Sequence, residues 1–304
     1  MADSDLPPGY RSGFVVTFGR PSVGKSTLIN AILGQLVVSV SPRPQTTRRR
    51  QLGILTLPQA QIVFVDCPGI HHPRTKLGER LNTLARDTLQ DADVILALFD
   101  LSQPPKPEDR LTATAIEALP SPPPVLAVLN KVDAVPASQL GERVALFFDL
   151  LPRSEPFLLS ATRGDGRQAL LDRILGLLPL GPRYYPEEEI TDTNEREIAA
   201  DLIRSAALHL LRDEVPHGIA VRVDEYTERG EHGAFIAATL FVERESHKGI
   251  VIGKGGTMLR QIGSQARREI EVMSGRKVYL ETRVKVFQGW RDDEQALRQL
   301  GYDA

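Results

Sequence analysis

The segment Gly19-Arg20-Pro21-Ser22-Val23-Gly24-Lys25-Ser26, followed by Thr27, decides the fold of the first half of this 304-residue chain. It matches the Gly-x4-Gly-Lys-Ser pattern of a phosphate-binding loop, between a strand-like run (14–18) and a helical run (27–33). In such a loop the backbone N–H groups face nucleotide phosphates, Lys25 supplies a cation to the outer phosphates, and Ser26 gives a hydroxyl ligand to Mg²⁺. The pattern predicts a nucleotide-binding site but does not indicate which base is bound.

Short β-rich runs alternate with amphipathic helical stretches through the first part of the chain. The runs 14–19, 61–66, 94–100, 125–130 and 157–160 are apolar enough to be buried strands. Strands that alternate with helices indicate βαβ units, which build a parallel sheet. We therefore predict an α/β P-loop domain with a mainly parallel sheet over residues 1–182.

Two later motifs indicate that the base is guanine. In Asn130-Lys131-Val132-Asp133 the Asp133 carboxylate can accept from both the ring N–H and the exocyclic amine of guanine, a donor pair that adenine lacks. Asn130 can bridge the base and the phosphate loop, and the Lys131 stem can lie over the purine. The backbone N–H groups of Ser160, Ala161 and Thr162 suit the guanine keto oxygen. The predicted ligands are GTP and GDP.

The catalytic and metal candidates are Lys25, Ser26, Thr47, Asp66 and Gly69. Asp66-Cys67-Pro68-Gly69 ends a strand, so Asp66 can hold Mg²⁺ through water and the Gly69 N–H can meet the γ-phosphate. Within the candidate switch 42–50 we favour Thr47 over Thr46 as the residue that closes onto Mg²⁺ in the GTP state. Lys25, Thr47, Asp66 and Gly69 are the predicted catalytic residues, and Ser26, Thr47 and Asp66 the metal ligands.

The position after this motif predicts slow hydrolysis. Ras-like enzymes carry a water-orienting glutamine where this chain has Ile70, which cannot polarise water. We expect the water to be positioned by backbone, an ion or a partner. The neighbouring Arg48, Arg49 and Arg50 are expected to be solvated or to face RNA rather than to act as an internal arginine finger.

A proline-rich stretch separates the first domain from a second. We predict a linker over 183–194 and a smaller α+β domain over 195–304, with helices at 195–212 and 257–273 and strands at 217–224, 233–243 and 278–287. Net charge is −2 overall, but residues 244–291 contain 11 basic and 4 acidic residues, a net charge of +7. A local excess of this kind suits binding to a phosphate backbone.

A Gly-x-x-Gly loop, Gly253 to Gly256, lies between two helical segments of this basic stretch. Glycines let a nucleic-acid backbone approach closely, and Lys254 projects toward phosphate. An isolated Gly-x-x-Gly is usually a tight turn between helices, but the surrounding element order predicts a type II KH domain. The candidate RNA-binding residues are Lys248, Gly249, Ile252, Gly253, Lys254, Gly255, Gly256 and Arg260.

Composition limits the remaining classes of protein. The start of the chain lacks the basic end and apolar stretch of a secretory signal, and the longest apolar runs are far shorter than the roughly 20 residues that span a bilayer. The single cysteine, Cys67, gives neither an internal disulfide nor a metal-site spacing, and is expected to be a packing residue. We expect a cytoplasmic monomer.

Taken together, the motifs resemble the Era family of bacterial ribosome-assembly GTPases across nearly the whole chain. The strings that carry the resemblance, besides the nucleotide motifs, are 44–48 (PQTTR), 245–263 (ESHKGIVIGKGGTMLRQIG) and 290–302 (WRDDEQALRQLGY). The resemblance implies binding to the 3′ end of 16S ribosomal RNA during maturation of the small (30S) subunit. It also implies a loose, peripheral association with the inner face of the cell membrane.

Two positions depart from the family pattern. Ser22 stands where the family commonly has an asparagine associated with potassium-assisted hydrolysis, so the resemblance does not carry potassium dependence over to this chain. Cys67 replaces a common threonine, while Asp66 and Gly69 are retained. Two rival functions stay open: a nucleotide-stabilised RNA chaperone without turnover, and a GTPase that acts on a protein or membrane partner with the KH domain as a spacer.

Overall fold

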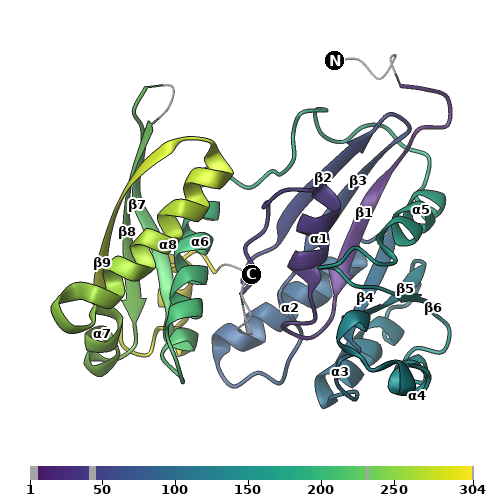
Figure 1. Cartoon of the computed structure of the whole chain (residues 1–304), viewed down its shortest axis with the longest axis horizontal. Coiled ribbons are helices and arrows are strands. Elements are labelled where there is room, and N and C mark those ends of the chain that lie inside the picture. Colours follow the sequence, from purple (N-terminus) through teal and green to yellow (C-terminus); the bar gives the residue numbers. More distant parts are fainter. Residues whose placement is uncertain (1–5, 41–45, 231–232, 303–304) are drawn as a thin grey trace. The chain divides into compact units, whose positions relative to one another are not determined.

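The computed structural model describes residues 6–40, 46–230 and 233–302 (Figure 1). The chain divides into two compact units. The first comprises Met1–Val38, Arg49–His72 and Leu81–Asp192, and the second Ser39–Arg48, Pro73–Arg80 and Thr193–Ala304. The division at Asp192 falls inside the predicted linker, and the part of the candidate switch up to Arg48 belongs to the second unit. None of the helices in the described part of the chain is long and apolar enough to cross a membrane.

A six-stranded sheet forms the centre of the first unit, in the order β2-β3-β1-β4-β5-β6. All neighbouring strands are parallel except β2, which pairs antiparallel with β3. Every residue of β3 and β4 is buried, as expected of strands covered on both faces. The strands are β1 (Arg11–Phe18), β2 (Gln51–Leu57), β3 (Ala60–Asp66), β4 (Val94–Asp100), β5 (Val125–Asn130) and β6 (Glu155–Leu158).

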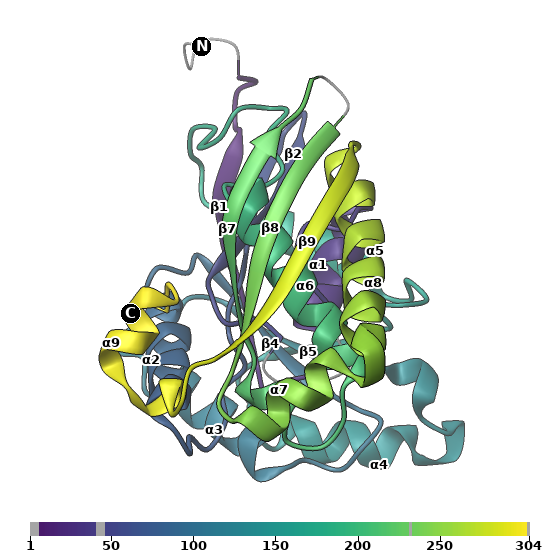
Figure 2. The same ribbon diagram turned by 90° about the vertical axis from the view of Figure 1, so that its left-hand side faces the viewer.

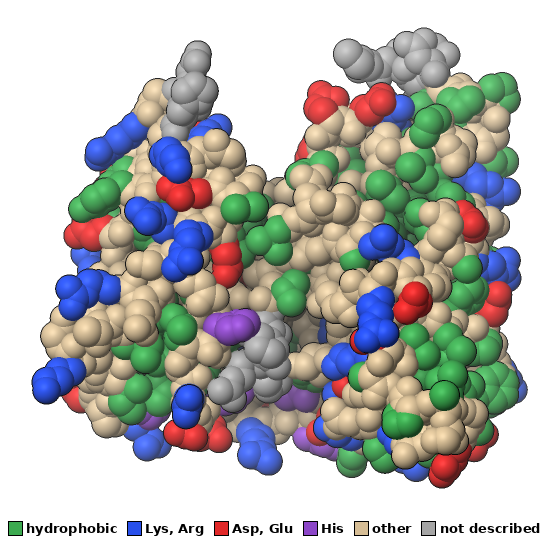
Figure 3. Space-filling view, in the orientation of Figure 1, with side chains coloured by type: hydrophobic (Ala, Val, Ile, Leu, Met, Phe, Trp, Pro, Cys, Tyr) green, Lys and Arg blue, Asp and Glu red, His purple; other side chains and the backbone are tan. Residues whose placement is uncertain are grey.

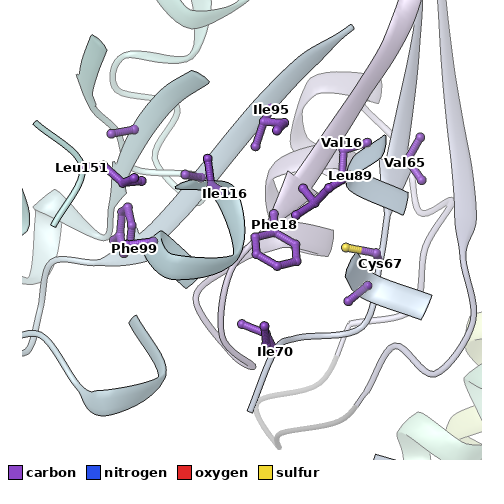
Figure 4. Close-up of a cluster of buried hydrophobic side chains, with 14 of the residues drawn as sticks. Val16, Phe18, Val65, Cys67, Ile70, Leu89, Ile95, Phe99, Ile116 and Leu151 are labelled. Atoms are coloured by element: carbon purple, nitrogen blue, oxygen red, sulfur yellow. The ribbon is translucent and has the colours of Figure 1, made fainter. Parts of the chain in front are cut away.

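Helices cover both faces of this sheet and leave the carboxyl ends of the strands for the loops that carry the motifs. Adjacent β1 residues serve opposite cores: Val16 packs in one apolar cluster and Val15 in the other. Figure 4 shows part of the Val16 cluster, including Phe18, Cys67 and Ile70. The helices are α1 (Lys25–Leu33), α2 (Lys76–Gln90), α3 (Pro107–Glu117), α4 (Ala137–Phe148) and α5 (Arg167–Leu177).

The predicted strands of this unit agree with the structure to within one residue except at β1, β2 and β6. Strand β1 begins at Arg11, three residues before the predicted start, and ends at Phe18. Strands 94–100 and 125–130 have the predicted bounds, whereas β6 begins at Glu155 and ends at Leu158, so residues 159–160 belong to the following loop. Strand β2 was not predicted, because Gly53 interrupts its apolar pattern. A side chain at Gly53 would meet Ile29 and Leu33 of α1 at 2.8 Å, so the glycine allows close packing of helix on strand.

The second unit is a three-stranded sheet, in the order β7-β8-β9, with α6 and α8 packed on one face (Figure 2). Strand β7 is antiparallel to β8, and β9 is parallel to it. Asn194 caps α6 by accepting from the Glu197 N–H. The elements are α6 (Glu195–Leu210), β7 (Ala220–Glu228), β8 (Gly233–Val242), α7 (Glu245–Ile252), α8 (Thr257–Ser274), β9 (Lys277–Val286) and α9 (Glu294–Gln299).

The expected strand at 217–224 is displaced. Residues Pro216–Gly218 form a short 3-10 helix, and the strand runs from Ala220 to Glu228 with a bulge between Val223 and Glu225. Proline supplies no backbone N–H, so the ladder starts beyond it. The turn expected at 228–232 includes residues 231–232, which lie outside the described part of the chain.

Arg48 is buried, which corrects the expectation that it is solvated or faces RNA. It belongs to the second unit, where it is 2% exposed. Its guanidinium donates to the carbonyls of His217 (3.0 Å) and Ile219 (2.8 Å). It also lies over the rings of Trp290 and Tyr302, at 5.6 and 5.8 Å from their centroids. Arg49 and Arg50 are half-buried and exposed, respectively.

Candidate nucleotide site and RNA loop

The phosphate loop joins β1 to α1 with a backbone that only certain residues tolerate. Gly24 has φ 104°, and a side chain there would meet the Asn130 amide nitrogen at 2.3 Å. Ser22 also has a positive φ, 62°, a region in which asparagine is favoured over serine. The Lys25 ammonium donates to the carbonyls of Gly19 (3.2 Å) and Arg20 (3.1 Å), so it lies against the loop as the motif predicts.

The electrostatics of Lys25 indicate a site that needs negative charge. Burial lowers the pKa of Lys25 below its usual value, and the nearby Asp66 carboxylate opposes this shift. A phosphate group beside Lys25 would favour the charged ammonium in the same way as Asp66 does. The loop, the helix N-terminus and Lys25 therefore form a cradle for an anion.

Ser26 and Asp66 lie together at the metal side of the site. The Ser26 hydroxyl donates to Asp66 Oδ2 at 2.6 Å, and Thr17 holds the other carboxylate oxygen at 3.4 Å. A hydroxyl and a carboxylate are the hard oxygen donors that Mg²⁺ takes, so these two residues fit that ion. Gly69 lies so close to the loop that a side chain on it would meet the Pro21 nitrogen at 2.5 Å. Asp66 and Gly69 thus lie beside the phosphate loop, and their roles toward Mg²⁺ and the γ-phosphate stay predictions.

Asn130 connects the two halves of the nucleotide site. Its amide nitrogen donates to the Val23 carbonyl at 2.8 Å, and its amide oxygen accepts from the Ala161 N–H at 3.0 Å. The bridge from Asn130 to the phosphate loop is therefore as expected. The Ala161 N–H, which was expected to donate to the guanine keto oxygen, donates to Asn130 Oδ1 in this structure. Ser160 is buried, and its hydroxyl contacts Thr162 Oγ1 (3.3 Å) within the same loop.

Asp133 and Lys131 occupy the base side. Asp133 lies in the 3-10 turn Val132–Ala134, half-buried, with Arg163 at 3.9 Å. Lys131 adopts φ 65° and donates to the Ser22 carbonyl at 2.9 Å, so its stem spans from the guanine motif to the phosphate loop. The Asp133 carboxylate therefore lies in the loop that would contact the guanine base.

An ion-pair network behind the phosphate loop was not predicted from the sequence. Arg20 Nε donates to both oxygens of Asp109 (3.1 and 3.2 Å), and its Nη2 is 3.4 Å from Asp100. The Lys131 ammonium is 2.8 Å from Asp100. The network connects the phosphate loop to the guanine motif, because Arg20 and Lys131 both contact Asp100. The Arg20 side chain is engaged in this network, so its predicted contribution to nucleotide binding comes from its backbone in the loop. Asp100 ends β4 beside β5, a placement that could have drawn attention to it; Asp109, inside α3, gave no such signal.

Opposing effects set the pKa values of the two carboxylates. Burial alone would raise the pKa of Asp100, but hydrogen bonds from Lys131 and Ser102 and the charges of Lys131 and Arg20 outweigh it, so the pKa is lowered. Burial raises the pKa of Asp109 despite the Lys106 N–H and Arg20. Arg20 is the cation that opposes this rise in the pKa of Asp109, whereas Lys131 and Arg20 both lower that of Asp100.

Ile70 and Cys67 belong to the core behind the site. Both are completely buried and pack with Phe18 (Figure 4). The Ile70 N–H donates to the Gly19 carbonyl at 3.2 Å, so its side chain points away from the loop that would hold a γ-phosphate. Burial raises the pKa of the Cys67 thiol to about 12, which is consistent with the packing role expected for it.

Thr47 lies in the second unit and is buried, as is Thr46. Residues 42–45 of the predicted switch fall outside the described residues. The role of Thr47 as a metal ligand therefore stays a prediction.

The predicted RNA loop is a glycine turn between α7 and α8. Gly253, Gly255 and Gly256 have φ values of 71°, 61° and 76°, and a side chain on Gly253 would meet the Met258 backbone nitrogen at 2.9 Å. Lys254 is exposed at its tip, and Arg260 donates to the Gly255 carbonyl at 2.7 Å. The turn geometry explains why glycine is needed there.

Side chains around this loop form a basic surface. Gly249 is exposed, Ile252 is half-buried, and Lys248 is 3.8 Å from Glu245. Figure 3 shows Lys and Arg side chains over the visible face of α8, which carries the exposed Arg260, Arg267 and Arg268. The charge excess counted in the sequence is therefore displayed at the surface of the second unit.

Comparisons with known proteins identify the family. Residues 14–131 match the family model described as 50S ribosome-binding GTPase, and residues 214–291 match the KH domain model. GTPase Era of Caldanaerobacter subterraneus subsp. tengcongensis is 44% identical over 294 residues, covering 96% of this chain and 98% of that protein. The chain belongs to the GTPase Era family. The Geobacter metallireducens member is 45% identical over 300 residues, covering 98% of this chain and 99% of that protein.

Solved structures of the family match the whole fold. A crystal structure of Era in complex with MgGDPNP and nucleotides 1506–1542 of 16S ribosomal RNA has a TM-score of 0.91 at 38% identity, covering 97% of this chain and all of that one. The crystal structure of an Aquifex aeolicus Era variant bound to GDP·AlF₄⁻ has a TM-score of 0.90 with the same identity and coverage. The predicted family, the P-loop domain with a type II KH domain and the GTPase activity are confirmed.

Proposed function

We propose that this chain is a GTP-hydrolysing switch that binds the 3′ end of 16S ribosomal RNA and acts in maturation of the 30S subunit. The observation that carries the proposal is the match, across both domains, to an Era structure with a GTP analogue and that RNA segment. The resemblance extends the proposal to a cytoplasmic monomer with a peripheral contact to the inner membrane face. Residues 1–182, 183–194 and 195–304 are the proposed G domain, linker and KH domain.

The nucleotide site supports binding of GTP or GDP with Mg²⁺. Ser26 and Asp66, whose oxygens lie 2.6 Å apart, would hold the ion together with Thr47. The ion would neutralise charge on the phosphates. Lys25 and the loop N–H groups bind the phosphates, Asp133 selects guanine, and Gly69 offers its N–H to the γ-phosphate.

The structure around Ile70 supports slow intrinsic turnover. Its buried side chain cannot orient the attacking water, and Ser22 lacks the amide that the family associates with potassium assistance. Positioning of water is left to backbone groups, an ion or the RNA-bound partner. We therefore propose that turnover rises when 16S ribosomal RNA is bound.

A loop variant tests the RNA part of the proposal. In Lys254→Asp/Gly255→Asp two carboxylates replace a cation and a glycine; a side chain at Gly255 meets nothing within 4 Å, and aspartate tolerates its positive φ. We expect affinity for the 16S 3′ segment to fall about tenfold or more, with GTP turnover without RNA unchanged. Gly141→Asp, at an open position of α4, is the matched control and should change neither.

Nucleotide states test the switch and the enzyme. RNA affinity measured with GTP analogue, with GDP and without nucleotide should differ. Equal affinity in all three states would contradict a switch, and absence of GTP turnover with and without RNA would favour the chaperone. If Lys254→Asp/Gly255→Asp left maturation of the 30S subunit unchanged, the KH domain would act as a spacer and the GTPase would act on a protein or membrane partner.

A further inference from the structure

The outer sheet face of the second unit lies opposite α6 and α8 and is turned toward the viewer in Figure 2. Alternate residues of β8, such as Ile236 and Leu240, are buried beneath the helices, so the residues between them point outward. We define this face by the outward residues and the Arg229 that covers one of them: Arg222, Asp224, Glu225, Arg229, Phe235, Ala237, Thr239, Phe241, Lys277, Tyr279, Glu281, Arg283 and Lys285.

An aromatic platform occupies one end of the outer sheet face. Phe235 and Tyr279 are directly paired in the β8–β9 register, and their rings stack at 5.8 Å between centroids with 15° between planes. The Arg229 guanidinium lies over Phe235 at 4.8 Å. Tyr279 is nevertheless 66% exposed, which is unusual for so large a ring. A flat, exposed ring supported from behind is the geometry on which a nucleic-acid base stacks.

Cations continue from this platform along β9. Glu281, Arg283 and Lys285 follow Tyr279 at alternate positions, so neighbouring outward side chains lie about 6.6 Å apart along the strand. Arg283 is held in place by Thr239 (2.7 Å) and Asp224 (2.9 Å), yet its side chain is 59% exposed. A guanidinium oriented in this way loses little freedom when it binds phosphate.

The charge balance of the face favours a polyanion. It carries five cations and three carboxylates, a net charge of +2 by count. One of the carboxylates, Asp224, is engaged by Thr239, Arg222 and Arg283, and these bonds lower its pKa although burial alone would raise it. Its charge is thus used to orient the arginines, and the excess of cations faces solvent.

We propose that the outer sheet face is a second binding surface for single-stranded RNA, separate from the loop Gly253–Gly256. Bases stack on Tyr279 and phosphates contact Arg283 and Lys285. Strand β9 is one edge of the sheet and packs against α7 and α8, the helices that flank the loop, so a longer RNA bound at the loop can continue onto β9. This inference rests on the proposed function only in taking RNA as the occupant of that loop.

RNA length separates the two surfaces. The full chain is titrated with a 16S 3′ oligonucleotide of about four nucleotides, the span of a KH groove, and with one about three times as long. For Tyr279→Ala we expect roughly tenfold weaker binding of the long RNA and unchanged binding of the short one. Tyr279→Phe keeps the ring and should bind both as the parent does. Val272→Ala, at a 77% exposed residue of α8, is the control.

The salt dependence of RNA affinity gives a second test, which does not require that Tyr279→Ala folds correctly. Lys285→Gln should lower the slope of log affinity against log salt by about 0.7 for the long RNA and leave it unchanged for the short RNA. Unchanged long-RNA affinity in Tyr279→Ala, or an unchanged slope in Lys285→Gln, would overturn the second surface. If the parent protein failed to bind the short RNA, the proposed role of the loop Gly253–Gly256 in RNA binding would be wrong, which is a distinct result.

Discussion

Replacement of Asp109 by asparagine should destabilise the first unit, because it leaves the Arg20 cation buried without its main partner. Arg20 and Asp109 side chains are 8% and 0% exposed, and Arg20 Nε lies within 3.2 Å of both carboxylate oxygens. Breaking a buried pair of this kind costs about 3 to 5 kcal/mol. Asp100, 3.4 Å from Arg20, still compensates part of the charge, so we expect about 3 kcal/mol.

Urea unfolding measures this loss in the unit where it occurs. The single tryptophan, Trp290, lies in the second unit, so its fluorescence reports that unit, while far-ultraviolet circular dichroism reports both. With a slope of about 2 kcal/mol/M, the dichroism midpoint of the first unit should fall by about 1.5 M, and the Trp290 transition should stay in place. Affinity for a fluorescent GDP should fall too, since Arg20 belongs to the phosphate loop.

A second ion pair serves as a matched control, because it distinguishes the effect of burial on the free energy of unfolding from the effect of contact distance. Arg173 and Glu155 form a closer pair, 2.7 Å, but both side chains are 44% exposed. Glu155→Gln should therefore cost less than about 1 kcal/mol. The double variant Arg20→Met/Asp109→Leu should recover most of the unfolding free energy, because burial opposes the charged pair as a whole. If Asp109→Asn cost no more than Glu155→Gln, the Arg20 charge would be solvated and the argument refuted.

Three further outcomes concern the base side, the lone thiol and the buried arginine of the second unit. Asp133→Asn should weaken GTP binding about ten- to hundredfold in a fluorescence titration and improve binding of xanthosine triphosphate, whose exocyclic C2 keto oxygen accepts where the exocyclic amine of guanine donates; unchanged GTP affinity would remove Asp133 from the site. The Cys67 thiol, with its pKa raised to about 12 by burial, stays protonated as the pH rises to about 9, so it should react with a thiol reagent only when urea unfolds the first unit; fast labelling of the native chain would contradict this. Arg48→Met should lower the Trp290 unfolding transition by about 2 kcal/mol or more, because the His217 and Ile219 carbonyls lose their donors; Arg50→Met, at an exposed position, should not.

The features of this protein that depend on local spacing are predictable from its amino-acid sequence. The phosphate loop needs Gly24 for its positive φ and Lys25 next to it, and both requirements are visible within eight residues. The same holds for Gly253 to Gly256 between two helices. Continuous apolar runs predicted β4 and β5 with the observed bounds, because strands buried on both faces need apolar residues at every position.

The partners of the buried charged side chains depend on tertiary packing and are not predictable from the sequence. Arg20 could have faced a nucleotide and Arg48 solvent; instead Arg20 meets Asp109 from a distant helix, and Arg48 lies over the rings of Trp290 and Tyr302. Such pairs join residues up to 254 positions apart, so no periodicity in the sequence marks them. They form because a long basic side chain that is buried must find acceptors wherever packing places them. The outward pairing of Phe235 with Tyr279 likewise exists only through the register of β8 and β9.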